Sequence, residues 1–148
     1  MDDNLRREII LDNYQDPYNK GLIDDSSYIK VNTSSDSCID NLDFILKKDN
    51  DIIVDIRFDG EACAISTSAS SIMIRKLIGM NVNSAKELLT NYKNMIEGKD
   101  YDENLLGELN VYDKICNQPN RKNCALLPSI AIEKLLGELN KWKLMLIN

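Results

Sequence analysis

The clearest pattern in the chain is an alternating stretch that gives way to a helical one near Gly60. Apolar residues occupy every second position of residues 52–58, which predicts a half-buried strand with one face formed by Ile52, Val54, Ile56 and Phe58. Gly60 is expected to end this strand. From Ile65 the apolar spacing changes to three and four, which predicts an amphipathic helix that ends at Gly79, where a left-handed cap is favoured.

Cys63 lies between these two elements and is therefore expected at a helix N-terminus. The unpaired amides and the positive end of the helix dipole favour a thiolate there, which is the reactive and metal-binding form of cysteine. The alternative is that Cys63 serves as a small buried apolar residue.

A second alternating stretch covers residues 38–47, with Leu42, Phe44 and Leu46 in its apolar row. Cys38 and Asp40 continue this row, so a thiol and a carboxylate are expected side by side at the start of the strand. A buried aspartate needs a cation, a metal or water as partner, unless the strand end is frayed and Asp40 is solvated. The polar residues 49–51 predict a hairpin turn into the strand at 52–58.

The remaining pattern is mostly helical. Capping-box spacing from Ser84 to Glu87 precedes an apolar stripe, which predicts a helix that begins near Ser84 and extends to about Ile96. The other predicted elements are a helix at 4–14, a strand at 28–31, a polar connection at 32–37, a polar loop at 97–104 and a short helix at 105–115.

Cys124 belongs to a last helical stretch that contains Pro128. Either the helix begins near Asn120 and kinks at the proline, or Cys124 lies in a turn and the helix starts at Pro128. Both alternatives place Cys124 near a helix N-terminus.

Composition narrows the possible functions. A length of 148 residues suits one domain over 1–148, and a net charge of -6 argues against nucleic acid or an anionic membrane as the main partner. The acidic start and the lack of a long apolar run indicate neither a signal peptide nor a membrane span, so a cytoplasmic location is expected. The four cysteines are then expected as thiols or metal ligands, and the absence of histidine excludes histidine-based acid-base catalysis.

Four residues at predicted strand and helix ends, Cys38, Asp40, Cys63 and Cys124, offer enough ligands for tetrahedral zinc. Their spacing contains no C-x-x-C pair, so spacing alone does not separate them from unrelated cysteines.

Four segments resemble the motifs of a known family. Residues 12–21 (DNYQDPYNKG) resemble D-H-Y-x-x-P-x-N-x-G, and residues 38–40 (CID) resemble C-G-D. Residues 60–70 (GEACAISTSAS) resemble G-x-x-C-A-I-S-x-A-S-x-S, and residues 121–127 (RKNCALL) resemble R-x-K-C-A-x-L. Together they resemble the SufU branch of the IscU and NifU N-terminal family of iron–sulfur cluster assembly proteins. Ile39 replaces the motif glycine, and Asn123 stands where IscU proteins have histidine.

The resemblance implies an α+β fold, in which a small antiparallel sheet of about three strands carries helices on one face. It also implies that Cys38, Asp40, Cys63 and Cys124 are metal ligands, for zinc or for iron in a [2Fe-2S] cluster. Cys38 is then expected as the acceptor of persulfide sulfur, with Cys124 as second candidate, and Arg121 either offsets the charge of the site or is an ordinary surface cation. Cys116 matches no family position and is expected as a buried or spare thiol.

Three functions remain open at this point. The first is a zinc-dependent, sulfurtransferase-like acceptor served by a SufS-like cysteine desulfurase, and the second is a scaffold that assembles a cluster for apo-protein acceptors. The third is a structural zinc or interaction module without sulfur transfer. The expected partners are proteins of iron–sulfur assembly, with neither nucleic acid nor membrane.

Overall fold

The computed structural model describes residues 1–34 and 39–147, with side chains up to residue 137. Its strands are β1 (Ile29–Ser34), β2 (Asn41–Asp49) and β3 (Ile52–Glu61). Its helices are α1 (Asp3–Gln15), α2 (Ala64–Leu77), α3 (Val82–Ile96), α4 (Glu103–Leu106) and α5 (Pro119–Ile147), with 3-10 turns η1 (Gly107–Tyr112) and η2 (Ile115–Asn117).

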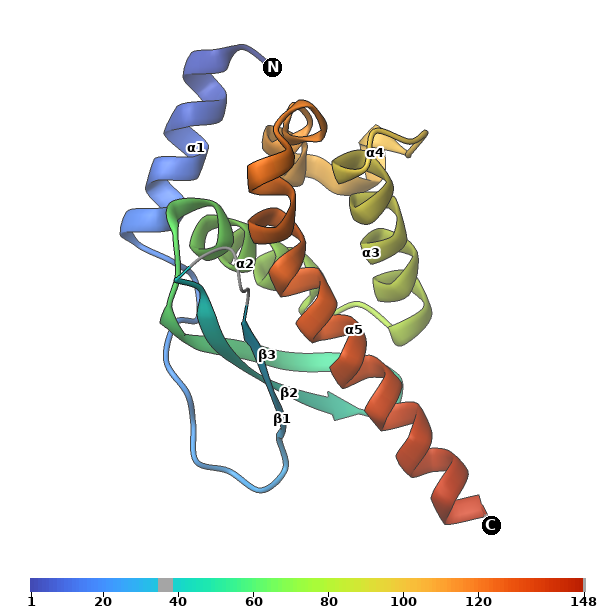
Figure 1. The fold of residues 1–148 in the computed structure, drawn as a ribbon. Helices are drawn as coiled ribbons and strands as arrows, with labels where there is room; N and C mark the ends of the chain where they lie inside the picture. Colours follow the sequence, from blue (N-terminus) through green and yellow to red (C-terminus); the bar gives the residue numbers. More distant parts are fainter. Residues whose placement is uncertain (35–38, 148) are drawn as a thin grey trace.

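The three strands form an antiparallel sheet in the order β1-β2-β3. Helices α2 and α5 lie against one face of this sheet, and α1 and α3 flank them in the same helical layer (Figure 1). The core lies between the two layers and is built from the apolar sides of β2, β3 and the helices. The predicted α+β class, with a small sheet and helices on one face, is confirmed.

The predicted face of β3 is wrong in its first half. Ile53, Ile56 and Phe58 are buried, whereas Ile52 and Val54 are exposed. The register with β2 shifts between Lys47 and Lys48, where a bulge adds one residue to the β3 side. Because side chains alternate along a strand, one added residue moves the following positions to the other face.

The strand boundaries also differ from the prediction. β1 includes residues 32–34, which were predicted as a connection, because these residues pair with the start of β2. β3 does not end at Gly60 but continues to Glu61. Gly60 has a φ of +129°, and a Cβ there would lie 2.2 Å from the Asn41 carbonyl oxygen, so a glycine allows β2 and β3 to stay paired at this end.

The hairpin and the helix after Cys63 are confirmed, since Asn50 turns the chain with a φ of 53° and α2 begins at Ala64. α3 begins at Val82 instead of near Ser84, because the Asn81 side chain caps it by accepting from the Ser84 amide at 2.8 Å. The predicted helix at 105–115 is divided into α4 and two 3-10 turns.

α5 settles the alternatives at Pro128. The helix begins at Pro119 and continues through Pro128, so the predicted start near Asn120 is confirmed and a start at Pro128 is wrong. Cys124 consequently lies in the second turn of α5. No helix in the described part of the chain is both long enough and apolar enough to cross a membrane.

Candidate metal centre

Cys63 occupies the junction between β3 and α2. It has extended backbone angles and is the N-cap of α2, where its sulfur accepts from the Ser66 amide at 3.5 Å. This bond satisfies one of the amides that a helix leaves unpaired at its start. The side chain is half-buried. The junction therefore fixes the sulfur at the helix N-terminus, as the sequence predicts.

Asp40 is brought to Cys63 by the pairing of β2 with β3. Asn41 lies opposite Glu61 in the register, so the residue before β2 meets the residues after β3. The Cys63 amide donates to Asp40 Oδ1 at 2.6 Å, and Cys63 Sγ lies 3.7 Å from Asp40 Oδ2. Asp40 is only 2% exposed. The structure thus excludes the alternative of a frayed strand end with a solvated aspartate.

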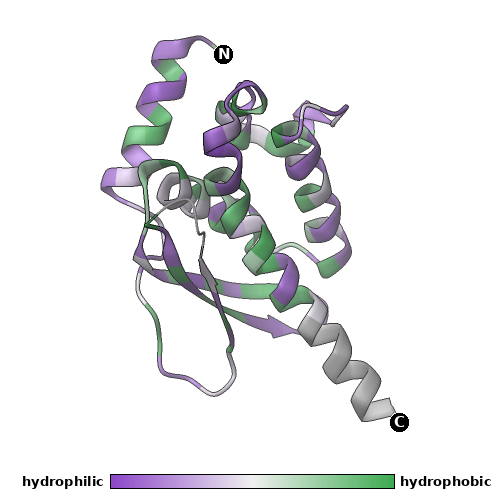
Figure 2. Cartoon of the chain, viewed as in Figure 1, coloured by the Kyte–Doolittle hydropathy of each residue, from purple (hydrophilic) through white to green (hydrophobic). Residues whose placement is uncertain are grey.

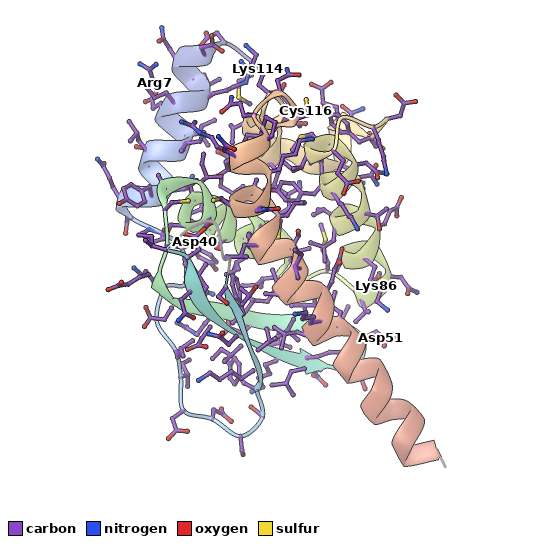
Figure 3. The ribbon with its side chains drawn as sticks, viewed as in Figure 1. Arg7, Asp40, Asp51, Lys86, Lys114 and Cys116 are labelled. Atoms are coloured by element: carbon purple, nitrogen blue, oxygen red, sulfur yellow. The ribbon has the colours of Figure 1, made fainter. Side chains whose placement is uncertain are left out.

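Cys124 approaches from the helical layer, where it is buried in the second turn of α5. One ligand atom each from Asp40, Cys63 and Cys124 lies within 4.8 Å of the other two. Figure 3 shows Asp40 beside the start of α2, at the end of the sheet. Three predicted ligands from three separate parts of the chain therefore converge, and the fourth, Cys38, lies outside the described residues.

The three ligand atoms fit a tetrahedral metal. Zinc binds thiolate sulfur at about 2.3 Å and carboxylate oxygen at about 2.0–2.2 Å, so neighbouring ligand atoms are about 3.5–3.8 Å apart. The sulfur–oxygen distance of 3.7 Å between Cys63 and Asp40 falls in this range, and all three ligand atoms lie within 4.8 Å of one another. Two thiols and one carboxylate also match the ligand preferences of zinc, and the two thiols match those of iron in iron–sulfur clusters.

Ser66 contacts the converging residues, although the sequence alone does not predict a role for it. Its hydroxyl is fully buried, and it lies within hydrogen-bonding distance of Asp40 Oδ2, of the Cys124 carbonyl oxygen at 2.9 Å and of Cys63 Sγ at 3.6 Å. The available signal was its position three residues after the cysteine, where a side chain can reach back to a helix N-cap. One hydroxyl therefore contacts all three converging residues.

A layer of polar groups lies behind the site. The Ser68 hydroxyl bonds the Tyr112 hydroxyl, and the Tyr92 hydroxyl donates to the carbonyl of Ala125 at 2.7 Å. Burial raises the pKa of Tyr112, the Ser68 hydrogen bond lowers it, and the negative charge of a Cys63 thiolate raises it further. Tyr112 therefore remains protonated and neutral next to the site.

A pocket of about 680 Å³ leads to the two sulfur-bearing residues. α1, η1, η2 and the first turns of α5 form its walls, and Cys63 and Cys124 line it together with Arg121. Arg121 is exposed, and it makes no ion pair among the described residues. Arg121, the cation predicted to offset the charge of the site, thus lines the same pocket as Cys63 and Cys124.

Cys116 lies apart from this group. Its sulfur contacts the Asp113 carbonyl oxygen at 3.5 Å, and Figure 3 shows it at the far end of the helical layer from Asp40. Ile39, the residue in the motif glycine's position, has a side chain that is 76% exposed and so takes no part in the core. Neither residue offers a ligand to the converging group.

Comparisons with known proteins agree with the motifs. The family model of the NifU-like N terminal domain matches residues 5–142. The zinc-dependent sulfurtransferase SufU of Bacillus subtilis is 35% identical over 133 residues, which is 89% of each chain. The iron–sulfur cluster assembly scaffold protein IscU of Thermotoga maritima is 28% identical over 134 residues, 90% of this chain and 94% of its own.

A solved structure shows the same fold. It is that of a candidate iron–sulfur cluster assembly scaffold protein for the SUF system of Fervidobacterium islandicum, with 33% identity and a TM-score of 0.77. The match covers 87% of this chain and 94% of that one. The chain therefore belongs to the family of the NifU-like N terminal domain, among the SufU and IscU proteins of iron–sulfur cluster assembly.

Proposed function

We propose that this protein accepts persulfide sulfur from a cysteine desulfurase at a zinc site formed by Cys38, Asp40, Cys63 and Cys124. The observation that carries the proposal is the convergence of ligand atoms from Asp40, Cys63 and Cys124 within 4.8 Å, beside a pocket that Cys63 and Cys124 line. The 35% identity to a zinc-dependent sulfurtransferase supports zinc and sulfur transfer over other uses of such a site.

The chemistry requires a thiolate and a route for the donor. When bound, zinc holds cysteine sulfurs as thiolates without redox change. Cys38 is the proposed acceptor and Cys124 the second candidate. The acceptor thiolate attacks the outer sulfur of the donor persulfide, a new S–S bond forms, the old one breaks, and the donor cysteine leaves as a thiolate. The terminal sulfur keeps its proton, so atoms and charge balance.

The pocket supports docking of a protein donor. Arg121 at its wall is a cation that can offset the charge of a site with three thiolates and one carboxylate. The proposed donor is a SufS-like desulfurase, and the proposed recipients are other proteins of iron–sulfur assembly in the cytoplasm. The absence of histidine in the whole sequence distinguishes this site from that of IscU proteins, which carry a histidine where this chain has Asn123.

A scaffold role is the second candidate, because an IscU relative at 28% identity covers 90% of the chain and the same residues suit cluster iron. A closed structural zinc site, the third, needs an inaccessible and inert metal. The pocket that reaches both Cys63 and Cys124 favours the acceptor and scaffold functions, which need an accessible metal, over a closed structural zinc site.

The test is the metal content of protein purified without chelator. We compare the wild type with the Cys38→Ala, Asp40→Ala, Cys63→Ala and Cys124→Ala variants, and with Cys116→Ala as the matched control. The expected result is about one zinc per chain, lost in the three site-cysteine variants and retained in the control. Iron with sulfide would favour the scaffold, and a wild type without metal would overturn the proposed site.

Sulfur transfer needs its own measurement. We expect the wild type to increase desulfurase turnover and to carry the persulfide after incubation with desulfurase and cysteine, detected by mass spectrometry of alkylated peptides. Cys38→Ala is expected to abolish both, whereas Cys116→Ala leaves them unchanged. A zinc-loaded protein that neither takes sulfur nor exchanges its metal with a chelator would support the structural alternative.

A further inference from the structure

The Ser66 hydroxyl is the point where the three described ligand residues are joined. The hydroxyl is within hydrogen-bonding distance of Asp40 Oδ2 and of the Cys124 carbonyl oxygen, and the Ser66 amide donates to Cys63 Sγ. The residue is 0% exposed, so water does not substitute for these contacts. A single side chain in the first turn of α2 thus contacts groups contributed by the start of β2 and by α5.

The geometry at Asp40 shows what this contact does. The Cys63 amide holds Oδ1 at 2.6 Å, and the Ser66 hydroxyl holds Oδ2. Bonds from two donors on the two oxygens fix the rotation of a carboxylate, and bonds to a charged acceptor are stronger than neutral ones. One backbone amide and one replaceable side chain therefore contribute to the orientation of Asp40 relative to Cys63.

The other buried hydroxyls of α2 have different partners. Ser70 donates to the Ser66 carbonyl at 2.7 Å, Ser71 donates to Asn13 Oδ1 at 2.7 Å, and Ser68 bonds Tyr112. Among the described hydroxyls of this helix, Ser66 is thus the one that contacts the carboxylate. Ser70, one turn further along and equally buried, is a matched control for loss of a hydroxyl from this helix.

We propose that Ser66 is a positioning residue of the metal site: it fixes the Asp40 carboxylate in the orientation that binds metal, and so sets the affinity of the site and the ease with which Asp40 leaves it. The inference rests on the proposed metal site. Outer partners of metal ligands act in this way in other proteins, and their removal costs about 10–100-fold in metal affinity.

The test is competition for zinc between a chromophoric chelator and the wild type, Ser66→Ala, Ser66→Thr or Ser70→Ala protein. We expect Ser66→Ala to lose about 10–100-fold in affinity and Ser70→Ala to remain like the wild type. Ser66→Thr keeps a hydroxyl and is expected to recover affinity. Cobalt-substituted protein provides a second signature, since a freed carboxylate changes the visible ligand-field spectrum in Ser66→Ala and not in Ser70→Ala.

Urea unfolding of the metal-free variants separates positioning from folding, because both alanine variants remove one buried hydroxyl from the same helix. Similar unfolding of Ser66→Ala and Ser70→Ala, with different zinc affinities, would support the proposal. Equal losses of zinc affinity in the two variants, or no loss in Ser66→Ala, would overturn it.

A double-mutant comparison identifies the path of the effect. If Ser66 acts through Asp40, Ser66→Ala has little further effect on zinc affinity in an Asp40→Ala background. If Ser66→Ala lowers zinc affinity just as much in the Asp40→Ala background, Ser66 acts through Cys124 instead of Asp40, and the proposal is overturned. A wild type that binds no zinc would reject the metal site itself and the role of Ser66 with it, whereas a normal wild type beside an unaffected Ser66→Ala would reject the role of Ser66 alone.

Discussion

Helices α2 and α3 are nearly equal in length, with 14 and 15 residues, but they are buried in different ways. α3 buries one side, formed by Val82, Ala85, Leu88, Leu89, Tyr92, Met95 and Ile96. α2 is buried almost all round, and five of its buried residues are serine or threonine: Ser66, Thr67, Ser68, Ser70 and Ser71. Figure 2 shows both strongly hydrophobic (green) and strongly hydrophilic (purple) residues along α3.

The difference indicates that α3 mainly stabilises the fold, whereas α2 positions other side chains. An apolar side gains stability from burial in proportion to area and specifies few directions. Buried hydroxyls gain little net stability, but each requires a partner in a defined place. α2 thus carries the bonds that locate Asp40, Tyr112 and Asn13, and α3 provides burial.

The largest expected effect belongs to the apolar side of α3. Leu88→Ala removes a fully buried side chain from the contact between α3 and the core and is expected to cost about 2–5 kcal/mol in the free energy of unfolding. The measurement is urea unfolding followed by circular dichroism. Glu87→Ala, on the exposed side of the same helix, is the control and should change stability by less than about 0.5 kcal/mol. Equal effects would show that α3 does not act through its apolar side.

A smaller effect is expected from the hydroxyls of α2. Ser68→Ala leaves the buried Tyr112 hydroxyl without its side-chain partner, and we expect a loss of about 1–3 kcal/mol. Combining Ser68→Ala with Tyr112→Phe removes both partners and should recover part of that loss, again measured by urea unfolding. A double variant that is less stable than the sum of the single ones would contradict an interpretation based on hydrogen bonding.

The smallest effect concerns the ion pairs of Asp3, one within α1 and one that links α1 to Lys114, between η1 and η2. Asp3 lies 2.9 Å from both Lys114 Nζ and Arg6 Nη1. The hydrogen bond from Lys114 and its charge lower the pKa of Asp3 below the ordinary value of 3.8, and Arg6 adds to the shift. Because the pKa is lowered in the folded state, the contribution is present above about pH 4 and disappears as the pH falls through the folded pKa.

The Asp3→Asn variant tests these ion pairs through the pH dependence of the free energy of unfolding. The wild type should be slightly more stable than the variant at neutral pH, and the difference should shrink as the pH is lowered through the range below 4 and as salt is added. A difference that grows on acidification would have the wrong sign for a carboxylate with a lowered pKa.

Much of the fold could be predicted from local pattern. The hairpin at Asn50, the helix after Cys63 and the apolar side of α3 each depend on residues close together in sequence, and all are confirmed. The exposed position of Val54 could not be predicted, because the bulge depends on how β3 pairs with β2. The same holds for residues 32–34, which are polar and become a strand by pairing with β2.

The candidate site shows the same division. Cys38, Asp40, Cys63 and Cys124 were predicted as metal ligands, and three of them converge in the described part of the chain. The continuation of α5 through Pro128 could not be decided locally, since the sequence allowed a start on either side of Cys124. The contacts of Ser66 with Asp40 and Cys124 could not be predicted, because these partners are 26 and 58 residues away in the chain.

The sequence by itself determined the residue types that can bind a metal, the absence of histidine, and the helix N-terminus that presents Cys63. These follow from composition and from short-range periodicity. Only the tertiary structure decided that β2–β3 pairing places Asp40 on Cys63, that α5 brings Cys124 to both, and that the Ser66 hydroxyl joins them. The physical reason is that these contacts form between distant segments, and their geometry is set by how the sheet and helices pack together.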